Sequence, residues 1–181
     1  MTFDEAWAYT STISSETAFS EQEGRALFIT VLSGLPHAST IVEVGCEYGR
    51  STSLLAQAAK ADQHRLILIE PAPKPELLAM LQHIGVLYTL HAMKTEHVSD
   101  DLLPFVVNLI HIDGDHSAAA LQIDCERLLP RLVPGGIACF HDYGRPSLPD
   151  VQAVVDRYTA SEDIWQRIGI FGTLRVLRKR I

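Results

Sequence analysis

The segment of residues 42–52, VEVGCEYGRST, constrains the fold of this chain more than any other. It begins as a short apolar run, passes through Gly45 and Gly49, and continues into an Ala- and Leu-rich helical pattern. A buried strand, a glycine turn and a helix in this order form the repeating unit of open α/β sheets. Ligands of such sheets bind beyond the carboxyl ends of the strands, so the turn also marks the expected ligand site.

Strand-like and helix-like patterns alternate along the rest of the chain. A capping box of Ser20 and Glu23 predicts a helix to about residue 32, after a shorter helix at residues 4–10. Strands are expected at residues 40–44, 66–69, 86–91, 106–112 and 137–140, helices at residues 51–60, 75–83, 117–132 and 147–158, and a hairpin at residues 164–177. The segment Pro134-Gly135-Gly136 is expected to stop the helix before it, and Ser147 to cap the last helix. This order predicts an α/β fold with a doubly wound, mostly parallel sheet and an antiparallel hairpin at its end.

The composition argues against several classes of protein. With 181 residues, 47% of them hydrophobic, the chain suits one domain with a full core. A formal net charge of −7 without a run of Lys or Arg argues against nucleic-acid binding. No apolar run reaches the roughly 18 residues of a membrane span, and the N-terminus does not resemble a secretory signal. The three cysteines lack disulfide or zinc spacing, so we expect reduced thiols in a cytoplasmic protein.

The glycine turn distinguishes between two classes of nucleoside ligand. The dinucleotide pattern G-x-G-x-x-G, begun at Gly45, requires glycine where this chain has Glu47 and Arg50. A carboxylate about 4 Å from a pyrophosphate costs on the order of 4 kcal/mol at an effective dielectric of 20, so NAD is disfavoured. S-adenosylmethionine (SAM) carries a positive sulfonium and no phosphate, and its carboxylate suits the start of the following helix. Glu70 ends the second strand, where a carboxylate can accept ribose hydroxyls; the alternative is a solvated loop acid.

Four sequence blocks together carry a family resemblance. They are Glu43-x-Gly45-x-x-x-Gly49-Arg50-Ser51-Thr52, Ile69-Glu70-Pro71, Ile112-Asp113-Gly114-Asp115-His116-Ser117, and Pro134-Gly135-Gly136 leading to Phe140-His141-Asp142-Tyr143. From about residue 40 to the C-terminus the chain resembles class I SAM-dependent methyltransferases. More narrowly, it resembles the small bacterial methyltransferase-domain family related to sugar O-methyltransferases and to cephalosporin-hydroxylase-like proteins.

The resemblance implies a fold, an activity and a cofactor site. It implies a Rossmann-like sheet of seven strands in residues 40–181, preceded by a helical segment at residues 1–39. It implies SAM-dependent methylation, here of a small hydroxylated acceptor such as a sugar, a phenol or another metabolite. The residues expected around SAM are Glu43, Gly45, Cys46, Glu47, Tyr48, Gly49, Ser51, Thr52, Glu70, Pro71, Ala92, Met93 and Asp113.

Candidate catalytic side chains follow the fourth and fifth predicted strands. Asp113, Asp115 and His116 follow one of them, and His141 and Asp142 follow the other. Methyl transfer to a hydroxyl needs a general base or a cation beside the acceptor oxygen. We expect Asp113, His116, His141 and Asp142 to be catalytic, with His116 as base because an unperturbed imidazole titrates near pH 6.5.

A divalent cation is a second expectation at these strand ends. Asp113 and Asp142 are the expected ligands, and Mg²⁺ favours such carboxylate oxygens. Related metal-dependent methyltransferases carry an acid where this chain has His141, and imidazole suits Zn, Fe or Ni better than Mg²⁺. Metal dependence therefore stays open at the level of sequence.

Other interpretations remain for the same residues. Asp113-Gly114-Asp115 is also a pattern of turn chemistry, His141 also fits a packed histidine, and His111 is expected to be structural. Cys46 is expected to fill space rather than act as a nucleophile. Competing functions are an inactive SAM-binding or partner-binding module of the same fold and an NAD-dependent oxidoreductase. The short segment before the first strand offers little cover for a substrate, and a homodimer would supply it.

Overall fold

The computed structural model describes residues 1–13 and 19–180. Within them, seven strands form one sheet in the order β3-β2-β1-β4-β5-β7-β6. The strands are β1 (Thr40–Val44), β2 (Arg65–Ile69), β3 (Tyr88–His91), β4 (Val107–Ile112), β5 (Leu132–Phe140), β6 (Trp165–Phe171) and β7 (Leu174–Lys179). The helices are α1 (Phe3–Thr10), α2 (Glu21–Gly34), α3 (Arg50–Ala61), α4 (Pro75–Ile84), α5 (Ala118–Leu128) and α6 (Pro149–Tyr158), with short 3₁₀ turns η1 (Thr95–His97) and η2 (Leu129–Arg131).

The strand register brings the expected site residues to one edge of the sheet. β1 pairs in parallel with β2 and β4, and β4 pairs in parallel with β5. Their last residues are in register, in the row Ile69, Val44, Ile112 and Phe140. The chain segments that follow these strands therefore lie side by side. β7 is antiparallel to β5 and to β6, which confirms the doubly wound, mostly parallel sheet with a C-terminal antiparallel hairpin.

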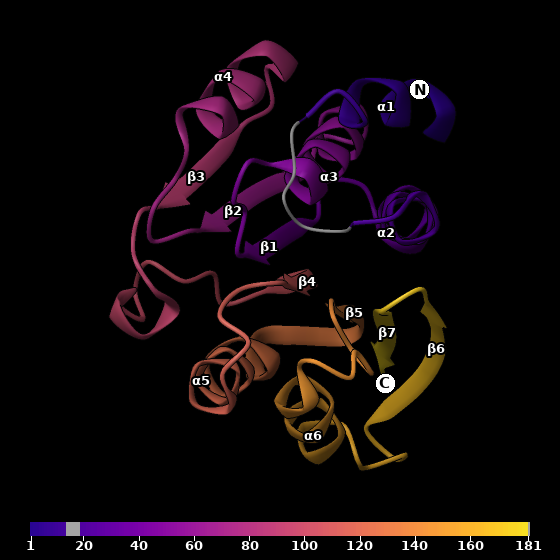
Figure 1. Ribbon diagram of the computed structural model, residues 1–181, viewed down its shortest axis with the longest axis vertical. Helices are drawn as coiled ribbons and strands as arrows, with labels where there is room; N and C mark the ends of the chain where they lie inside the picture. The colour runs from indigo at the N-terminus through magenta and orange to yellow at the C-terminus, as the bar shows by residue number, and fades with distance from the viewer. Residues whose placement is uncertain (14–18, 181) are drawn as a thin grey trace.

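Alternate residues of the central strands face two separate apolar layers. Ile41 packs in one cluster with residues of α1 to α4, whereas Val42 and Val44 pack in the other with residues of α5 and α6. Figure 1 shows these two groups of helices on opposite sides of the sheet. Strands buried on both faces need near-continuous apolar sequence, which explains why β2 reads Leu-Ile-Leu-Ile after its first residue.

The N-terminal helices pack on α3 rather than forming a separate unit. Ser20 and Glu23 form the capping box expected at the start of α2. The Gln57 side chain of α3 donates to the carbonyl oxygen of Ala6 in α1, and the hydroxyls of Thr10 and Ser53 share a buried hydrogen bond. Residues of α2 and α3 belong to the same apolar cluster, so α2 lies over the same face of the sheet as α3.

Two local expectations were wrong. Pro134-Gly135-Gly136 does not stop a helix but lies inside β5, because α5 already ends at Leu128 and the η2 turn contains Pro130. A register shift in the β4–β5 pairing and the left-handed φ of +80° at Gly135 accommodate the extra residues.

The second wrong expectation concerns Ser147. It does not cap α6, which begins at Pro149 without a side-chain cap. Proline at the first helical position presets the backbone for this start.

The helices of the described residues are all too short or too polar to cross a lipid bilayer.

Candidate active site

A cavity of about 480 Å³ opens at the carboxyl ends of β1, β2, β4 and β5. This size is typical of sites for small molecules and cofactors. Eight of the expected cofactor residues line it: Gly45, Cys46, Glu47, Tyr48, Ser51, Glu70, Pro71 and Asp113. The four expected catalytic residues do too: Asp113, His116, His141 and Asp142. The structure thus brings two separately predicted groups into one cavity.

The glycine turn requires glycine for a steric reason. Gly45 has a left-handed φ of +80°, and a Cβ there would overlap the backbone carbonyl oxygen of Asp113. Its N–H donates to the carbonyl oxygen of Ile69 at 3.0 Å, and the Asp113 N–H donates to that of Val44 at 2.9 Å. Gly45 therefore lets the loop after β4 approach the loop after β1, which closes the floor of the cavity.

Gly49 ends the same turn and begins α3. Its φ is +93°, and an added Cβ would lie 2.6 Å from Cε of Met80. As the N-cap of α3 it offers no side chain to the first-turn N–H groups. Uncapped N–H groups and the helix dipole favour an anion at this position.

Glu70 holds the glycine turn against the end of β2. Its Oε2 accepts hydrogen bonds from the backbone N–H groups of Cys46 at 2.9 Å and Glu47 at 3.2 Å, and its Oε1 accepts from Ala72 at 2.9 Å. A carboxylate has about four acceptor positions, so one position on Oε1 remains for a ligand hydroxyl. The geometry therefore leaves capacity for a hydrogen bond from one ribose hydroxyl, where the sequence led us to expect both.

Glu43 lies beneath the turn rather than in the cavity. Its side chain is fully buried, its Oε1 accepts from the Ser51 hydroxyl at 2.6 Å, and the same oxygen lies 3.3 Å from Nδ1 of His111. Burial, and then the Glu43 charge, raise the pKa of Cys46 well above its usual value. The Cys46 thiol is therefore unionised at neutral pH and fills space, as expected from the sequence.

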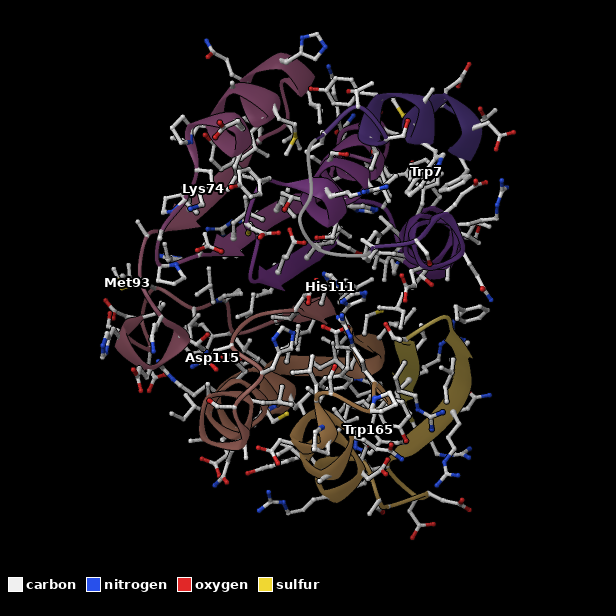
Figure 2. All side chains as sticks on the ribbon, viewed as in Figure 1. Trp7, Lys74, Met93, His111, Asp115 and Trp165 are labelled. Atoms are coloured by element: carbon white, nitrogen blue, oxygen red, sulfur yellow. The ribbon has the colours of Figure 1, made fainter. Side chains whose placement is uncertain are left out.

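Five expected cofactor residues do not line the cavity: Glu43, Gly49, Thr52, Ala92 and Met93. Thr52 is buried, whereas Ala92 is exposed. After β3 the cavity wall comes from Lys94, Thr95 and Glu96 instead. Figure 2 shows Met93 beside this segment, at the outer side of the molecule. That these five residues bind the cofactor stays a prediction.

The four expected catalytic side chains form an acid–imidazole cluster, defined as Asp113, His116, His141 and Asp142. Nδ1 of His141 lies 3.1 Å from Oδ1 of Asp113 and 3.7 Å from Oδ2 of Asp142. Nε2 of His116 lies 3.0 Å from the same Asp142 oxygen and 3.7 Å from Oδ1 of Asp113. His116 is 36% exposed, whereas the His141 side chain is only 3% exposed. The cavity can therefore present His116 to a ligand.

The imidazoles of His116 and His141 are both in their protonated, positively charged form at neutral pH in this arrangement. The neighbouring carboxylates of Asp113 and Asp142 raise the pKa of His116 to about 9. Burial by itself would lower the pKa of His141, but Asp113 and Glu23 raise it to about 10. Burial likewise opposes ionisation of Asp113, yet His116 and His141 bring its pKa well below the ordinary value. The sequence argument from an imidazole pKa near 6.5 therefore does not hold for His116.

The backbone at Asp142 turns the chain out of β5. The His141 N–H still donates to the carbonyl oxygen of Ile112 at 3.0 Å, which continues the pairing of β4 and β5. Asp142 then adopts a left-handed φ of +56°, uncommon for a residue with a side chain. Its Oδ1 accepts from Arg145 at 3.0 Å, so Oδ2 is the oxygen that faces the cluster.

Several cavity residues escaped the sequence analysis. They are Phe19, Lys94, Thr95, Glu96, Ala119, Ala120, Ile123 and Asp124. Arg50 also lines the cavity, and the sequence analysis named it as a missing glycine and within the first resemblance block. Asp124 carried a usable signal, because an acid in the apolar run Ile123-Asp124-Cys125 on a helix is unusual. Burial raises its pKa to about 6. Phe19 had no such signal in the sequence, because its position in the cavity depends on how α2 packs over the sheet.

The residues present fit the adenosyl cofactor that the resemblance implies. The cavity volume, the uncapped start of α3 and the remaining acceptor position on Glu70 suit its size, carboxylate and ribose. For a cation, ligand atoms of Asp113, His141 and Asp142 lie within 4.8 Å of one another. This donor set fits a divalent ion in composition, with one nitrogen beside carboxylate oxygens.

Comparison with known proteins agrees with this geometry. The model of a family described as a methyltransferase domain matches residues 42–143, more than half of the chain. No curated protein matches the sequence significantly. Among solved structures, a TDP-rhamnose 3'-O-methyltransferase of calicheamicin biosynthesis is similar with a TM-score of 0.67 at 15% identity, over 97% of this chain and 93% of that one.

Two further solved structures share the fold. An O-methyltransferase from Bacillus cereus, in complex with S-adenosylhomocysteine (SAH), has a TM-score of 0.67 at 14% identity, over 99% of this chain and 90% of that one. An SAH-bound methyltransferase from Podospora anserina has a TM-score of 0.67 at 17% identity, over 99% and 88%. At these identities the likeness concerns the fold, and the family match covers both the glycine turn and the acid–imidazole cluster. The chain therefore belongs to the methyltransferase-domain family and is a class I SAM-dependent methyltransferase.

Proposed function

We propose that this protein transfers a methyl group from SAM to a hydroxyl of a small acceptor, such as a sugar, a phenol or another metabolite. The observation that carries the proposal is the acid–imidazole cluster, which lines the same cavity as the glycine turn. A hydroxyl is a weak nucleophile until its oxygen is held beside a base or a positive centre. The cluster supplies such a centre at one end of the cavity.

The glycine-turn half of the cavity is the proposed SAM site. Gly45 admits close backbone approach, the start of α3 suits the methionine carboxylate, and Glu70 suits the ribose. When bound, SAM supplies an electrophilic methyl group on its sulfonium. Glu47, Glu70 and Asp113 line the cavity around this half, and their negative charges favour a cation over a pyrophosphate.

The cluster half of the cavity is the proposed acceptor site. His116 is the cluster imidazole that is exposed to the cavity, and its ring nitrogen contacts Asp142 at 3.0 Å. We assign His116 to hold the acceptor oxygen and, as the hydroxyl proton passes to solvent, to stabilise the negative charge that develops on that oxygen. A divalent cation held by Asp113 and Asp142 would polarise the same hydroxyl.

The test is a SAH-release assay on the full-length protein with matched acceptors. Each pair consists of a hydroxylated compound and its amine analogue, with product methylation checked by mass spectrometry. We expect turnover with members of the hydroxyl series and methylation at oxygen. SAH binding without turnover on any hydroxyl, or methylation confined to the amines, would contradict the proposal.

A further inference from the structure

His141 lies between the cavity and a carboxylate from the N-terminal helix. Its Nδ1 faces Asp113 at 3.1 Å and Asp142 at 3.7 Å, while its Nε2 lies 3.6 Å from Oε1 of Glu23 in α2. The ring of Phe19 packs on the imidazole with centroids 5.2 Å apart. With only 3% of the His141 side chain exposed, these neighbours fix which nitrogen points into the cavity.

Glu23 is itself held by groups other than His141. Its Oε1 accepts from the backbone N–H of Thr173 at 2.7 Å and from the Thr173 hydroxyl at 2.8 Å. Its Oε2 accepts from the backbone N–H and the hydroxyl of Ser20, each at 2.7 Å. The carboxylate is 3% exposed. The start of α2 and the turn between β6 and β7 therefore set its position, and His141 adapts to it.

We propose that Glu23 is a positioning residue that holds His141 with Nδ1 toward Asp113 and Asp142, and that these three side chains form a metal site with a nitrogen donor. The proposal rests on the proposed methyl transfer, because the site lies where the acceptor oxygen would be. Two ligand atoms about 2.1 Å from one ion lie about 3.0–3.4 Å apart, close to the 3.1 and 3.7 Å from Nδ1 of His141 to the two carboxylates.

The nitrogen donor changes which ion the site prefers. Carboxylate oxygens alone suit Mg²⁺, whereas an imidazole shifts preference toward Zn²⁺, Fe²⁺, Co²⁺ and Ni²⁺. A carboxylate behind a ligating imidazole fixes the ring and raises its basicity, which is the position of Glu23. Nδ1 of His141 lies within hydrogen-bond distance of Asp113, at 3.1 Å; an ion bound here replaces the proton on Nδ1, which leaves to solvent.

The test measures metal affinity rather than activity. The full-length protein is treated with a chelator and titrated calorimetrically with CoCl₂ and with MgCl₂, and the visible spectrum of the Co²⁺ form is recorded. We expect Co²⁺ to bind more tightly than Mg²⁺ and to show visible absorption bands. His141→Asp should lower the ratio of Co²⁺ to Mg²⁺ affinity about tenfold or more, and Glu23→Gln should weaken Co²⁺ binding about 10–100-fold.

A control variant separates positioning from general loosening of the fold. Glu21→Gln changes an exposed acid on the same helix and should keep the Co²⁺ affinity and spectrum of the unmodified protein. His141→Asp tests the nitrogen donor by itself if Glu23→Gln does not fold.

Three results would overturn the inference. They are no Co²⁺ binding by the unmodified protein at millimolar concentration, an unchanged metal preference in His141→Asp, and an unchanged Co²⁺ affinity in folded Glu23→Gln. SAH titration of the metal-free protein is the separate check on methyl transfer. SAH binding with any of these three results rejects the metal site alone, whereas absent SAH binding rejects the proposed function.

Discussion

The two halves of the cavity are built from different parts of the chain. In the glycine-turn half the backbone sets the shape: Gly45 lacks a Cβ where the next loop approaches, and Glu70 binds main-chain N–H groups. In the cluster half, charged side chains from the segments after β4 and β5 and from α2 hold one another. We expect the first half to bind the cofactor by shape even when the cluster is altered. Changes in the first half should therefore affect binding, and changes in the second should affect turnover.

The largest expected effect comes from Gly45→Ala. Its Cβ would overlap the Asp113 carbonyl, which costs about 1–3 kcal/mol for overpacking, and the left-handed φ adds about 1–3 kcal/mol of strain. We expect a strong loss of stability in urea unfolding and loss of SAH binding. Gly135→Ala is the matched control, because φ is also +80° but no atom lies within 4 Å of the added Cβ. Equal losses in the two variants would contradict a role for close backbone approach.

His116→Gln should separate turnover from binding. Glutamine keeps a hydrogen-bonding group toward the acceptor but removes the positive charge, so kcat should fall about 100-fold or more. SAH affinity measured by calorimetry should stay unchanged, since His116 belongs to the cluster half. A parallel loss of SAH affinity would show that the two halves are not independent.

Asp124→Asn tests the α5 wall of the cavity through the pH dependence of stability. Burial raises the pKa of Asp124 to about 6 from an ordinary 3.8. The folded state thus binds this proton more tightly than the unfolded state, so the stability tied to it is lost as pH rises through about 6. At one pKa unit per 1.36 kcal/mol, Asp124→Asn should add at most about 3 kcal/mol to the unfolding free energy at pH 8 and little at pH 4.

The measurement for Asp124→Asn is urea unfolding at several pH values, with Asp163→Asn as control. Asp163 is exposed, so its replacement should shift neither the midpoint nor its pH dependence. A constant difference between Asp124→Asn and the unmodified protein from pH 4 to pH 8 would rule out the buried carboxyl as the cause.

Glu70→Gln should have the smallest effect in this series. The amide has one oxygen where the carboxylate has two, so at least one hydrogen bond from Cys46, Glu47 or Ala72 is lost. We expect SAH to bind about tenfold more weakly, or about 1.4 kcal/mol, with kcat unchanged at saturating SAM. Glu76→Gln, an exposed change in α4, is the control. A fall in kcat with normal SAH affinity would place Glu70 in the chemistry instead.

The glycine-turn half was predictable because its determinants are local in sequence. Gly45, Gly49 and the apolar run before them specify a strand, a turn and a helix through backbone conformation alone. The alternation of strands and helices then predicts a parallel sheet. Its register brings Glu70, Asp113 and His141 together at the carboxyl ends of the strands. Even the position of His116 near Asp142 could be expected, because both follow neighbouring strands.

The cluster half was predictable only in part. Nothing in the sequence connects Glu23 to His141, which lie 118 positions apart, since their contact depends on how α2 packs over the sheet. The pKa of His116 depends on two carboxylates at specific distances, and residue type alone gave the wrong value. The end of α5 was also misjudged, because helical spacing continued through Leu132 although β5 already begins there.

Calorimetric titration with SAH tests the central claim most directly, in the unmodified protein and in the double variant His116→Gln/His141→Gln. The account predicts one SAH site in each, with dissociation constants within about threefold of each other, or about 0.6 kcal/mol. Failure of the unmodified protein to bind SAH at millimolar concentration, or loss of binding in the double variant while its circular dichroism is unchanged, would contradict it.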